Sequence, residues 1–437
     1  MPHTGPAGLM YTETLILEGH IIDSLLLPKV LDEILASGGR FELEEVRIGA
    51  LRHETSYARV RVWADTKKEL AQILRRVAVH GAQPLETQDA VTESAPADGV
   101  FPDEFYVTTN LETHIRLGGE WLLVEDIEMD CGIVVDLQAR AARAVPMHRV
   151  RQGELVVVGR HGVRVTPLAR QERGELFQFM RSEVSPEKSA GPLVANLAKL
   201  LRQLKAAGGK VLFVGGPAIV HTGARAFLVA LMRAGYVDFL FAGNALAVHD
   251  IECELYGTSL GVDVNRNEPA RDGHRNHLRA INTIRRLGGI RAAVEAGLLR
   301  GGIMHACVTQ GIPFVLAGSI RDDGPLPEVV TDVMHAQERM RTLARQADLA
   351  LMVATTLHSI AVGNLLPATT QIFCVDVNPA VVTKLCDRGS FQAVGMVGDA
   401  RSFLGELCRA LEISLEGTDG QAKATPTALA GAEKRDH

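Results

Sequence analysis

The stretch Lys210-Val-Leu-Phe-Val-Gly-Gly-Pro-Ala-Ile-Val-His-Thr-Gly-Ala224 decides the fold of this chain. An apolar, β-branched run meets a glycine turn, and a helical pattern from Ala224 to Ala234 follows that turn. This order presents backbone N–H groups and a helix N-terminus to a phosphate, although the glycines lack G-x-G-x-x-G spacing. Far downstream, Ile372-Phe-Cys-Val-Asp-Val-Asn-Pro379 ends an apolar strand on Asp376, the placement that binds a ribose diol. The two segments together predict a nucleotide site.

The length and composition restrict the class of protein. A chain of 437 residues is long enough for two or three domains. A formal net charge of −6 argues against a nucleic-acid binder, which needs a basic face. No stretch approaches the roughly 20 uninterrupted apolar residues of a membrane span, and the N-terminus lacks the pattern of a signal peptide. The six cysteines form no C-x-x-C pair, which indicates thiols in a reducing compartment. We therefore expect a soluble, cytoplasmic protein that binds neither nucleic acid nor membrane.

The first part of the chain, 11–83, follows a β-α-β-β-α order that predicts a small ferredoxin-like α+β domain. Gly38-Gly39 is expected to end the first helix, and Asp65-Thr66 to cap the second. Such a domain more often serves oligomerisation or substrate covering than chemistry. The polar segment 84–100, which contains two prolines, predicts a linker.

Short strands dominate 101–170, which we predict to be a β-rich module. Gly118-Gly119 signals a hairpin within it. The expected strands are 105–109, 113–117, 120–125, 132–136, 142–146, 154–159 and 163–167.

Apolar strands alternate with helical patterns from 188 to 412. The connections are long enough for crossover helices, so a Rossmann-like, doubly wound parallel sheet is expected, and the chain as a whole is α/β. Residues 414–437 show no periodicity and predict a disordered tail. The expected strands of the sheet are 211–215, 239–243, 313–317, 349–353 and 371–375.

Ligands of such sheets lie outside the carboxyl ends of the strands. Mostly polar residues and a glycine stand at these ends in the sequence, together with Ala245 and Leu357. They are Gly216, Asn244, Ala245, Arg321, Asp322, Asp323, Thr355, Thr356, Leu357, His358, Asp376 and Asn378.

Two of these residues have the chemistry of nucleotide contacts. The carboxylate of Asp376 would bind ribose hydroxyls and repel a 2′-phosphate, which favours NAD over NADP; alternatively it starts an Asp-x-Asn-Pro turn. Asn244 could bind nicotinamide or ribose, or be a plain turn residue.

The loop Arg321-Asp322-Asp323 combines one cation and two carboxylates. Adjacent carboxylates push one pKa upward, which suits a proton carrier or an ammonium clamp. The planar guanidinium of Arg321 could bind a substrate carboxylate. The alternative is a charged, capped turn before Pro325.

Histidines supply further titratable groups. His249-Asp250-x-Glu252 and His274-x-x-His277 are expected near the cleft, but no third ligand sits at helical spacing, so no metal is expected. His305 and His358 could face the substrate, or could pack or cap. The candidate catalytic residues are thus Asp322, Asp323, Arg321, His305 and His277.

Short segments that are each weak alone occur in one order between Tyr11 and about Ala410. In this order the chain resembles the archaeal-type ornithine cyclodeaminase family, also described as lysine-oxoglutarate reductase/saccharopine dehydrogenase-like. It is also similar to the C-terminal part of the bifunctional arginine dihydrolase/ornithine cyclodeaminase of cyanobacteria. The segments are Glu18-Gly-His-Ile-Ile-Asp-Ser24, Cys131-Gly-Ile-Val-Val135, Val145-Pro-Met147, Val214-Gly-Gly-Pro-Ala218, His221-Thr-Gly-Ala224, Gly243-Asn-Ala245, His249-Asp-Ile-Glu252, His274-Arg-Asn-His277, Ala317-Gly-Ser-Ile-Arg-Asp-Asp-Gly-Pro325 and Ala354-Thr-Thr-Leu-His-Ser359.

The resemblance implies a tightly held NAD and the conversion of L-ornithine to L-proline and ammonia. It also implies that the NAD site is lined by Asn244, Ala245, Asp322 or Asp323, Thr355 to His358, Asp376 and Asp399. Gly216, Asn378 and Gly398 complete the expected cofactor contacts, and Asp399 is also expected to cap the last helix. We expect no arginine hydrolysis, because the chain has no room for the amidine-hydrolysing domain, and we expect a homo-oligomer.

Three alternatives remain open. An NAD-dependent amino-acid dehydrogenase would share the cofactor site but release NADH. A deoxyhypusine-synthase-like transfer enzyme needs an active-site lysine, whereas Lys199, Lys205, Lys210 and Lys384 all lie outside the strand-end loops. The third is a non-enzymatic regulator that senses NAD or an amino acid, and the polar density of the loops argues against it.

Overall fold

The computed structural model describes residues 11–19, 21–22, 25–49, 54, 56–78, 80–85, 88–166, 190–259, 262–263, 275–322, 324–387 and 393–415. These residues form two compact units. The first draws on Met1–Ser182 and Ala361–Gln371, and the second on Glu183–Ile360, Ile372–Arg388 and Ala393–His437. The expected boundaries at 170 and 188 and the tail over 416–437 lie outside the described residues. Among the helices that are described, none is both long and apolar enough to cross a membrane.

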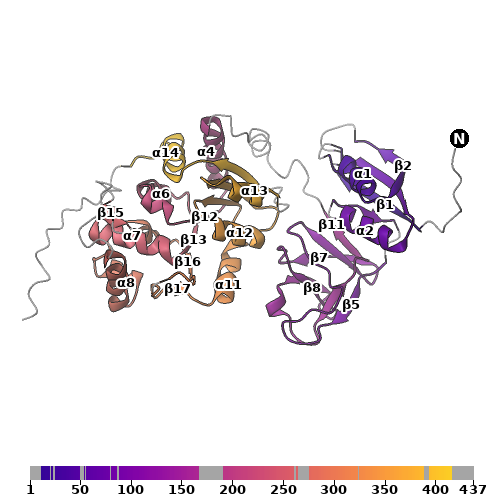
Figure 1. Cartoon of the computed structure of the whole chain (residues 1–437), viewed down its shortest axis with the longest axis horizontal. Helices are drawn as coiled ribbons and strands as arrows, with labels where there is room; N and C mark the ends of the chain where they lie inside the picture. The colour runs from indigo at the N-terminus through magenta and orange to yellow at the C-terminus, as the bar shows by residue number, and fades with distance from the viewer. Residues whose placement is uncertain are drawn as a thin grey trace, which may run out of the picture. The chain divides into compact units, whose positions relative to one another are not determined.

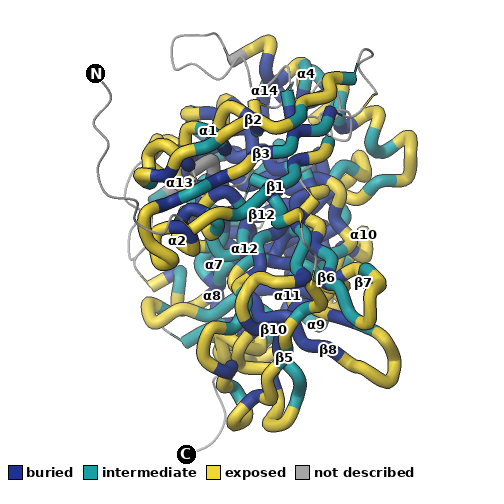
Figure 2. The backbone as a smooth tube through the Cα atoms, turned by 90° about the vertical axis from the view of Figure 1, so that its right-hand side faces the viewer, coloured by how far each residue is buried: buried dark blue, intermediate teal, exposed yellow. Residues whose placement is uncertain are grey.

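A four-stranded antiparallel sheet opens the first unit, in the strand order β2-β3-β1-β4. This is the order of a ferredoxin-like fold, as the sequence predicts. Residues along β3 alternate between buried and less buried (Figure 2), and the buried set packs against the two helices. The elements are β1 (Tyr11–Gly19), α1 (Leu26–Ala36), β2 (Arg40–Arg47), β3 (Ser56–Ala64), α2 (Lys67–Ala78) and β4 (Gln83–Pro84).

The predicted caps of both helices are confirmed. The N–H of Gly39 donates to the carbonyl of Ile34 at 2.9 Å, and Gly38 has a φ of 80°, as in a Schellman C-cap. At α2, Thr66 Oγ1 accepts the N–H of Glu69, and the Glu69 carboxylate accepts the N–H of Thr66, both at 3.1 Å. This reciprocal pair is a capping box.

Seven strands form the second sheet, in the order β11-β6-β7-β9-β8-β10-β5. The predicted hairpin at Gly118-Gly119 joins β6 to β7, and both glycines have positive φ. Two predictions are wrong here. Val91–Ser94 in the expected linker is strand β5 and pairs with β10, and of the expected strand 105–109 only Phe105 forms an isolated bridge. The strands are β5 (Val91–Ser94), β6 (Thr113–Leu117), β7 (Glu120–Glu125), β8 (Gly132–Asp136), β9 (Ala141–Val145), β10 (Leu155–Val158) and β11 (Val163–Val165).

The second unit is built on a seven-stranded sheet in the order β17-β16-β13-β12-β18-β19-β20. Figure 1 labels β12, β13, β16 and β17 of this sheet. The first strand of the unit, β12, lies in the middle, and the order reverses between β12 and β18. Apart from the short edge strand β17, this is the 3-2-1-4-5-6 order of a Rossmann fold. All five predicted strands are present, while β17 and β20 were not predicted. The strands are β12 (Val211–Gly215), β13 (Phe239–Gly243), β16 (Phe314–Ala317), β17 (Val329–Val330), β18 (Leu349–Val353), β19 (Gln371–Asp376) and β20 (Ala393–Val397).

Helices connect these strands, as a parallel sheet requires. They are α4 (Ala190–Ala206), α5 (Ala218–His221), α6 (Arg225–Arg233), α7 (Asn244–Tyr256), α8 (Asn276–Leu287), α9 (Ile290–Glu295), α10 (Ile303–Gln310), α11 (Val333–Ala344), α12 (Thr356–Leu365), α13 (Pro379–Asp387) and α14 (Ala400–Ala410). A two-stranded ribbon, β14 (Thr258–Ser259) with β15 (Val262–Asp263), follows α7.

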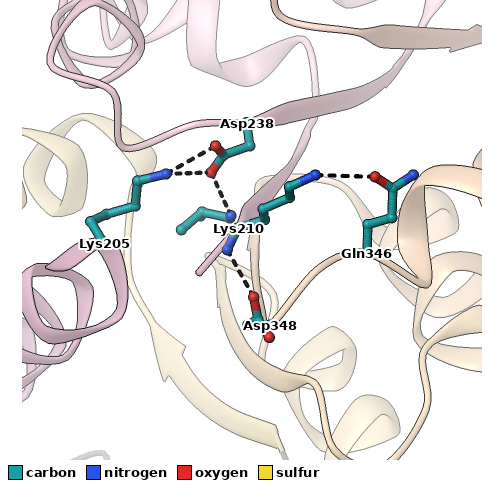
Figure 3. Close-up of polar contacts among 6 residues, drawn as sticks. Lys205, Lys210, Asp238, Gln346 and Asp348 are labelled. Carbon is teal, nitrogen blue, oxygen red and sulfur yellow. Dashed lines mark hydrogen bonds and ion pairs between the residues drawn. The ribbon is translucent and has the colours of Figure 1, made fainter. Parts of the chain in front are cut away.

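Polar side chains tie the amino ends of the central strands together (Figure 3). The Asp238 carboxylate before β13 binds Lys205 Nζ at 2.7 Å and accepts the N–H of Val211 at 2.7 Å. The Asp348 carboxylate before β18 accepts the N–H of Lys210 at 2.8 Å, and Lys210 Nζ donates to Gln346 at 3.1 Å. The lysines at this edge are therefore part of the framework of the sheet.

Candidate active site

The carboxyl ends of β12 and β18 approach each other closely at the point where the strand order reverses. The N–H of Gly216 donates to the Val353 carbonyl at 3.1 Å, and a Cβ on Gly216 would lie 1.8 Å from the Ala354 carbonyl oxygen. Only glycine fits this turn. Ala354 itself has a φ of 54°, a left-handed conformation that non-glycine residues adopt at an energetic cost, often at functional sites.

His358 lies over the tip of the neighbouring strand β13. Its Nδ1 is 3.2 Å from Thr355 Oγ1. A Cβ added to Gly243 would lie 3.0 Å from Cε1 of the His358 ring, so the ring packs against this glycine. Burial lowers the pKa of His358 below its ordinary value of 6.5, and the charge of Asp322 partly opposes this. The imidazole is therefore neutral near pH 7. The structure thus groups Thr355, His358 and Asp322 around the ends of three strands.

Asp376 and Asn378 form successive turns at the end of β19. Asp376 is 7% exposed, and its Oδ1 accepts the N–H of Asn378 at 2.8 Å. Asn378 Oδ1 in turn accepts the N–H of Ala380 at 3.0 Å at the start of α13. The turn that was the alternative for Asp376 is therefore present. Within the described residues, Oδ2 of Asp376 has no hydrogen bond, so the turn leaves one oxygen for a ligand.

The end of β20 completes this edge. The N–H of Gly398 donates to the Asp376 carbonyl at 3.0 Å, which places Gly398 and Asp399 beside the β19 turn. Asp399 caps α14, as predicted, by accepting the N–H groups of Arg401 and Ser402. The pKa of Asp399 is lowered, first by a hydrogen bond from the Ser402 side chain and then by these two backbone N–H groups.

Asn244 and the Arg321-Asp322 loop occupy the other half of the edge. Asn244 is buried, and its Oδ1 accepts the N–H of Leu326 at 3.1 Å, so this oxygen is used within the fold. Ala245 follows it in the first turn of α7. Asp322 Oδ2 accepts the N–H of Ser319 at 2.8 Å, whereas Arg321 is exposed. Asp323 lies outside the described residues.

The two histidines predicted as catalytic lie on helices α8 and α10 rather than in this loop. His277 on α8 packs against His249 on α7, with ring centroids 5.0 Å apart. His305 lies in the first turn of α10; burial and the charge of Arg233 lower its pKa. That turn is capped by Asp250, which accepts the N–H groups of Ile303 and Met304 at 2.8 Å each. His274 lies outside the described residues.

Sequence reasoning missed His221, although it stands in the opening motif. Its Nδ1 is 2.6 Å from Ser259 Oγ, and its ring centroid is 4.6 Å from that of His249. The roles of Thr258 and Asn276 were also missed, because their hydrogen bonds join residues of different elements. The available signal was a histidine between the glycine turn at Gly216 and the next glycine, Gly223.

The edge fits a dinucleotide. Ser359, in the first turn of α12, is 1% exposed, and its hydroxyl has no partner among the described residues. The N-termini of α5, α7 and α12 follow the ends of β12, β13 and β18, and helix N-termini favour phosphate. The sheet order, the glycine turn and the acidic strand end together define a Rossmann-type dinucleotide-binding fold.

Comparisons with known proteins agree with a Rossmann-type fold. A family model described as arginine dihydrolase ArgZ-like, C-terminal, Rossmann fold, matches residues 195–407. A model of the LOR/SDH bifunctional enzyme conserved region matches 12–111, and one of the ArgZ-like C-terminal first region matches 112–194.

Curated archaeal relatives match over almost their whole length. The ornithine cyclodeaminase of Methanothermobacter thermautotrophicus is 53% identical over 90% of this chain and 96% of its own. That of Methanopyrus kandleri is 52% identical over 92% of this chain and 97% of its own. The crystal structure of apo ArgZ, a cyanobacterial arginine dihydrolase, superposes with a TM-score of 0.81 at 39% identity, covering 94% of this chain and 60% of ArgZ. The chain therefore belongs to the ornithine cyclodeaminase family of ArgZ-like proteins, and the predicted resemblance is confirmed.

Proposed function

We propose that this chain is an NAD-dependent ornithine cyclodeaminase that converts L-ornithine to L-proline and ammonia. The observation that carries the proposal is the identity of 53% over 90% of the chain to a relative of that name. The Rossmann order of the sheet supports the nucleotide cofactor. The acidic end of β19 favours NAD, because a carboxylate there repels a 2′-phosphate.

The reaction sets the tasks of the protein. An unactivated amine is a poor leaving group, and NAD, when bound, would supply the temporary hydride acceptor that the α-carbon needs. The chain must bind the α-carboxylate, hold an ammonium group and move protons near neutral pH. We assign the ribose to Asp376, the phosphates to the turn at Gly216 and the N-terminus of α12, and the substrate carboxylate to Arg321. Asp322, beside it, is assigned to the ammonium group.

The proposal extends to the setting of the enzyme. The five cysteines whose side chains are described are free thiols, which supports a cytoplasmic location. Leu43 and Val46 on the edge strand β2 are 42% and 41% exposed, which supports a homo-oligomer.

The test is incubation of the purified protein with L-ornithine and NAD. Formation of proline and ammonia in equal amounts, without net NADH, is the expected result. Net NADH with little proline would instead identify an amino-acid dehydrogenase. NAD binding without either product would identify a regulator.

A further inference from the structure

Three imidazoles and one carboxylate form a cluster in the second unit that the assignments above leave unused. His249 lies between His221 and His277, with ring centroids 4.6 and 5.0 Å from its own. Glu252, one turn further along α7, places Oε2 3.2 Å from Nδ1 of His249. His249 is 4% exposed and Glu252 0%, whereas His277 is half-buried and His221 is exposed. The cluster therefore connects a buried acid–base pair to solvent through His221.

Hydrogen bonds fix the direction of the Glu252 carboxylate. The Thr258 hydroxyl donates to Oε1 at 2.8 Å, and the Asn276 amide donates to Thr258 Oγ1 at 3.0 Å. Oε2 is thereby aimed at His249 and accepts its Nδ1–H. A histidine held in this way presents Nε2 as a proton acceptor, and the carboxylate stabilises the imidazolium that forms.

The cluster lies close to the strand ends. His249 comes five residues after Asn244, the first residue of α7, which corresponds to about 7 Å along the helix axis. His221 ends the short helix α5, which follows the Gly216 turn. Both imidazoles therefore adjoin the edge that the proposed function assigns to the cofactor.

A metal site is the rival interpretation. Ligand atoms of His249, Glu252 and His277 lie within 4.8 Å of one another. The sequence argument against a metal was incomplete, because the third ligand comes from another helix, α8. The hydrogen bonds nevertheless favour proton transfer. Both carboxylate oxygens of Glu252 accept hydrogen bonds, and one of these comes from the His249 ring, which is the arrangement of a carboxylate that orients an imidazole.

We propose that His249, oriented by Glu252, is the general acid–base of the ornithine reaction, an inference that rests on the proposed function. Nε2 takes one proton from the α-ammonium, whose N–H electron pair stays on nitrogen and supports departure of the α-hydrogen as hydride. The product is an iminium ion. The δ-ammonium passes one proton to Asp322, which the proposed function places beside the ammonium group, and the free δ-amine adds to the iminium carbon. The imidazolium then returns its proton to the α-nitrogen, the ring nitrogen gives up its extra proton to solvent, and its electron pair expels ammonia. His221 and His277 flank the imidazolium, and His221 connects it to solvent.

The test compares His249→Gln and Glu252→Gln in the full chain, with His335→Gln on the exposed face of α11 as the matched control. Thermal unfolding and NAD titration establish that each variant is folded and binds cofactor. His249→Gln is expected to lower kcat by about 100-fold or more, and Glu252→Gln less. In Glu252→Gln the loss is expected in kcat rather than in KM, because the amide no longer orients the imidazole while the substrate contacts are kept.

Nitrogen-15 NMR of the histidine rings gives a readout independent of turnover. The wild-type chain is expected to show His249 protonated on Nδ1, and Glu252→Gln is expected to lose this tautomer. A wild-type kcat and an unchanged pH profile in His249→Gln would overturn the general acid–base role of His249, while proline formation would still support the proposed function. Stoichiometric metal that disappears in His249→Gln, with chelator-sensitive turnover, would also overturn it. Absence of proline from the wild type would instead refute the proposed function.

Discussion

Replacement of Gly216 by alanine tests the geometry at the centre of the site. The new Cβ would lie 1.8 Å from the Ala354 carbonyl oxygen, whereas ordinary contact begins near 3.4 Å, so the two segments must separate by about 1.6 Å. The separation strains the sheet edge by about 1–3 kcal/mol and weakens the hydrogen bond to Val353, which contributes about 1 kcal/mol. We therefore expect a loss of about 2–4 kcal/mol in the free energy of unfolding. The midpoint temperature of thermal unfolding should therefore fall by roughly 4–16 °C.

Calorimetry and NAD titration measure the two consequences. Because the turn adjoins the expected phosphate site, NAD affinity should fall at least about tenfold, the equivalent of 1.4 kcal/mol. The matched control is Gly191→Ala, since a Cβ at Gly191 in α4 meets nothing within 4 Å. If Gly216→Ala unfolds at the temperature of this control and binds NAD normally, the close approach of β12 and β18 is refuted.

Three further predictions concern the two edges of the sheet. Asp376→Ala should weaken NAD binding at least about tenfold, whereas unchanged affinity in a titration would remove Asp376 from the ribose site. Because the folded pKa of His358 lies below 6.5, its neutral form adds stability above that pH, and this is lost as pH falls through 6.5 toward the folded pKa. Melting curves of wild type and His358→Asn should therefore diverge between pH 8 and pH 5, and parallel curves would contradict the burial. Asp238→Ala should destabilise the second unit by about 1–3 kcal/mol in denaturant unfolding, because Val211 and Lys205 lose their acceptor; an unchanged midpoint would show that solvent replaces it.

Features that depend on a few neighbouring residues could be predicted from the sequence. The cap at Asp399, the end of α1 at Gly38 and the hairpin at Gly118-Gly119 all follow from local backbone chemistry. The alternation of strands and helices also predicted the parallel sheet, because crossover connections allow few topologies.

Features that depend on distant partners could not be predicted. Val91–Ser94 lies in a polar, proline-containing segment and becomes a strand only because β10 offers it an edge. Gly395 weakens the apolar strand pattern of β20 in the sequence. A Cβ there would lie 1.9 Å from Val382 Cγ1, so the glycine allows α13 to pack closely against β20. Similarly, the orientation of Glu252 depends on Thr258 and Asn276, whose positions only the fold supplies.

The positions of the lysines in the second unit also argue against the alternative of a lysine-dependent transfer reaction. An enzyme that carries an imine on lysine needs an uncharged amine at the strand ends beside the cofactor. Lys205 and Lys210 instead lie at the amino edge, one paired with Asp238 and the other bound to Gln346 (Figure 3). Strands of about five residues, near 3.3 Å each, separate these lysines from the carboxyl edge by about 16 Å. Covalent capture by these two lysines is therefore excluded by distance, and proton transfer at the carboxyl edge is assigned to carboxylates and imidazoles.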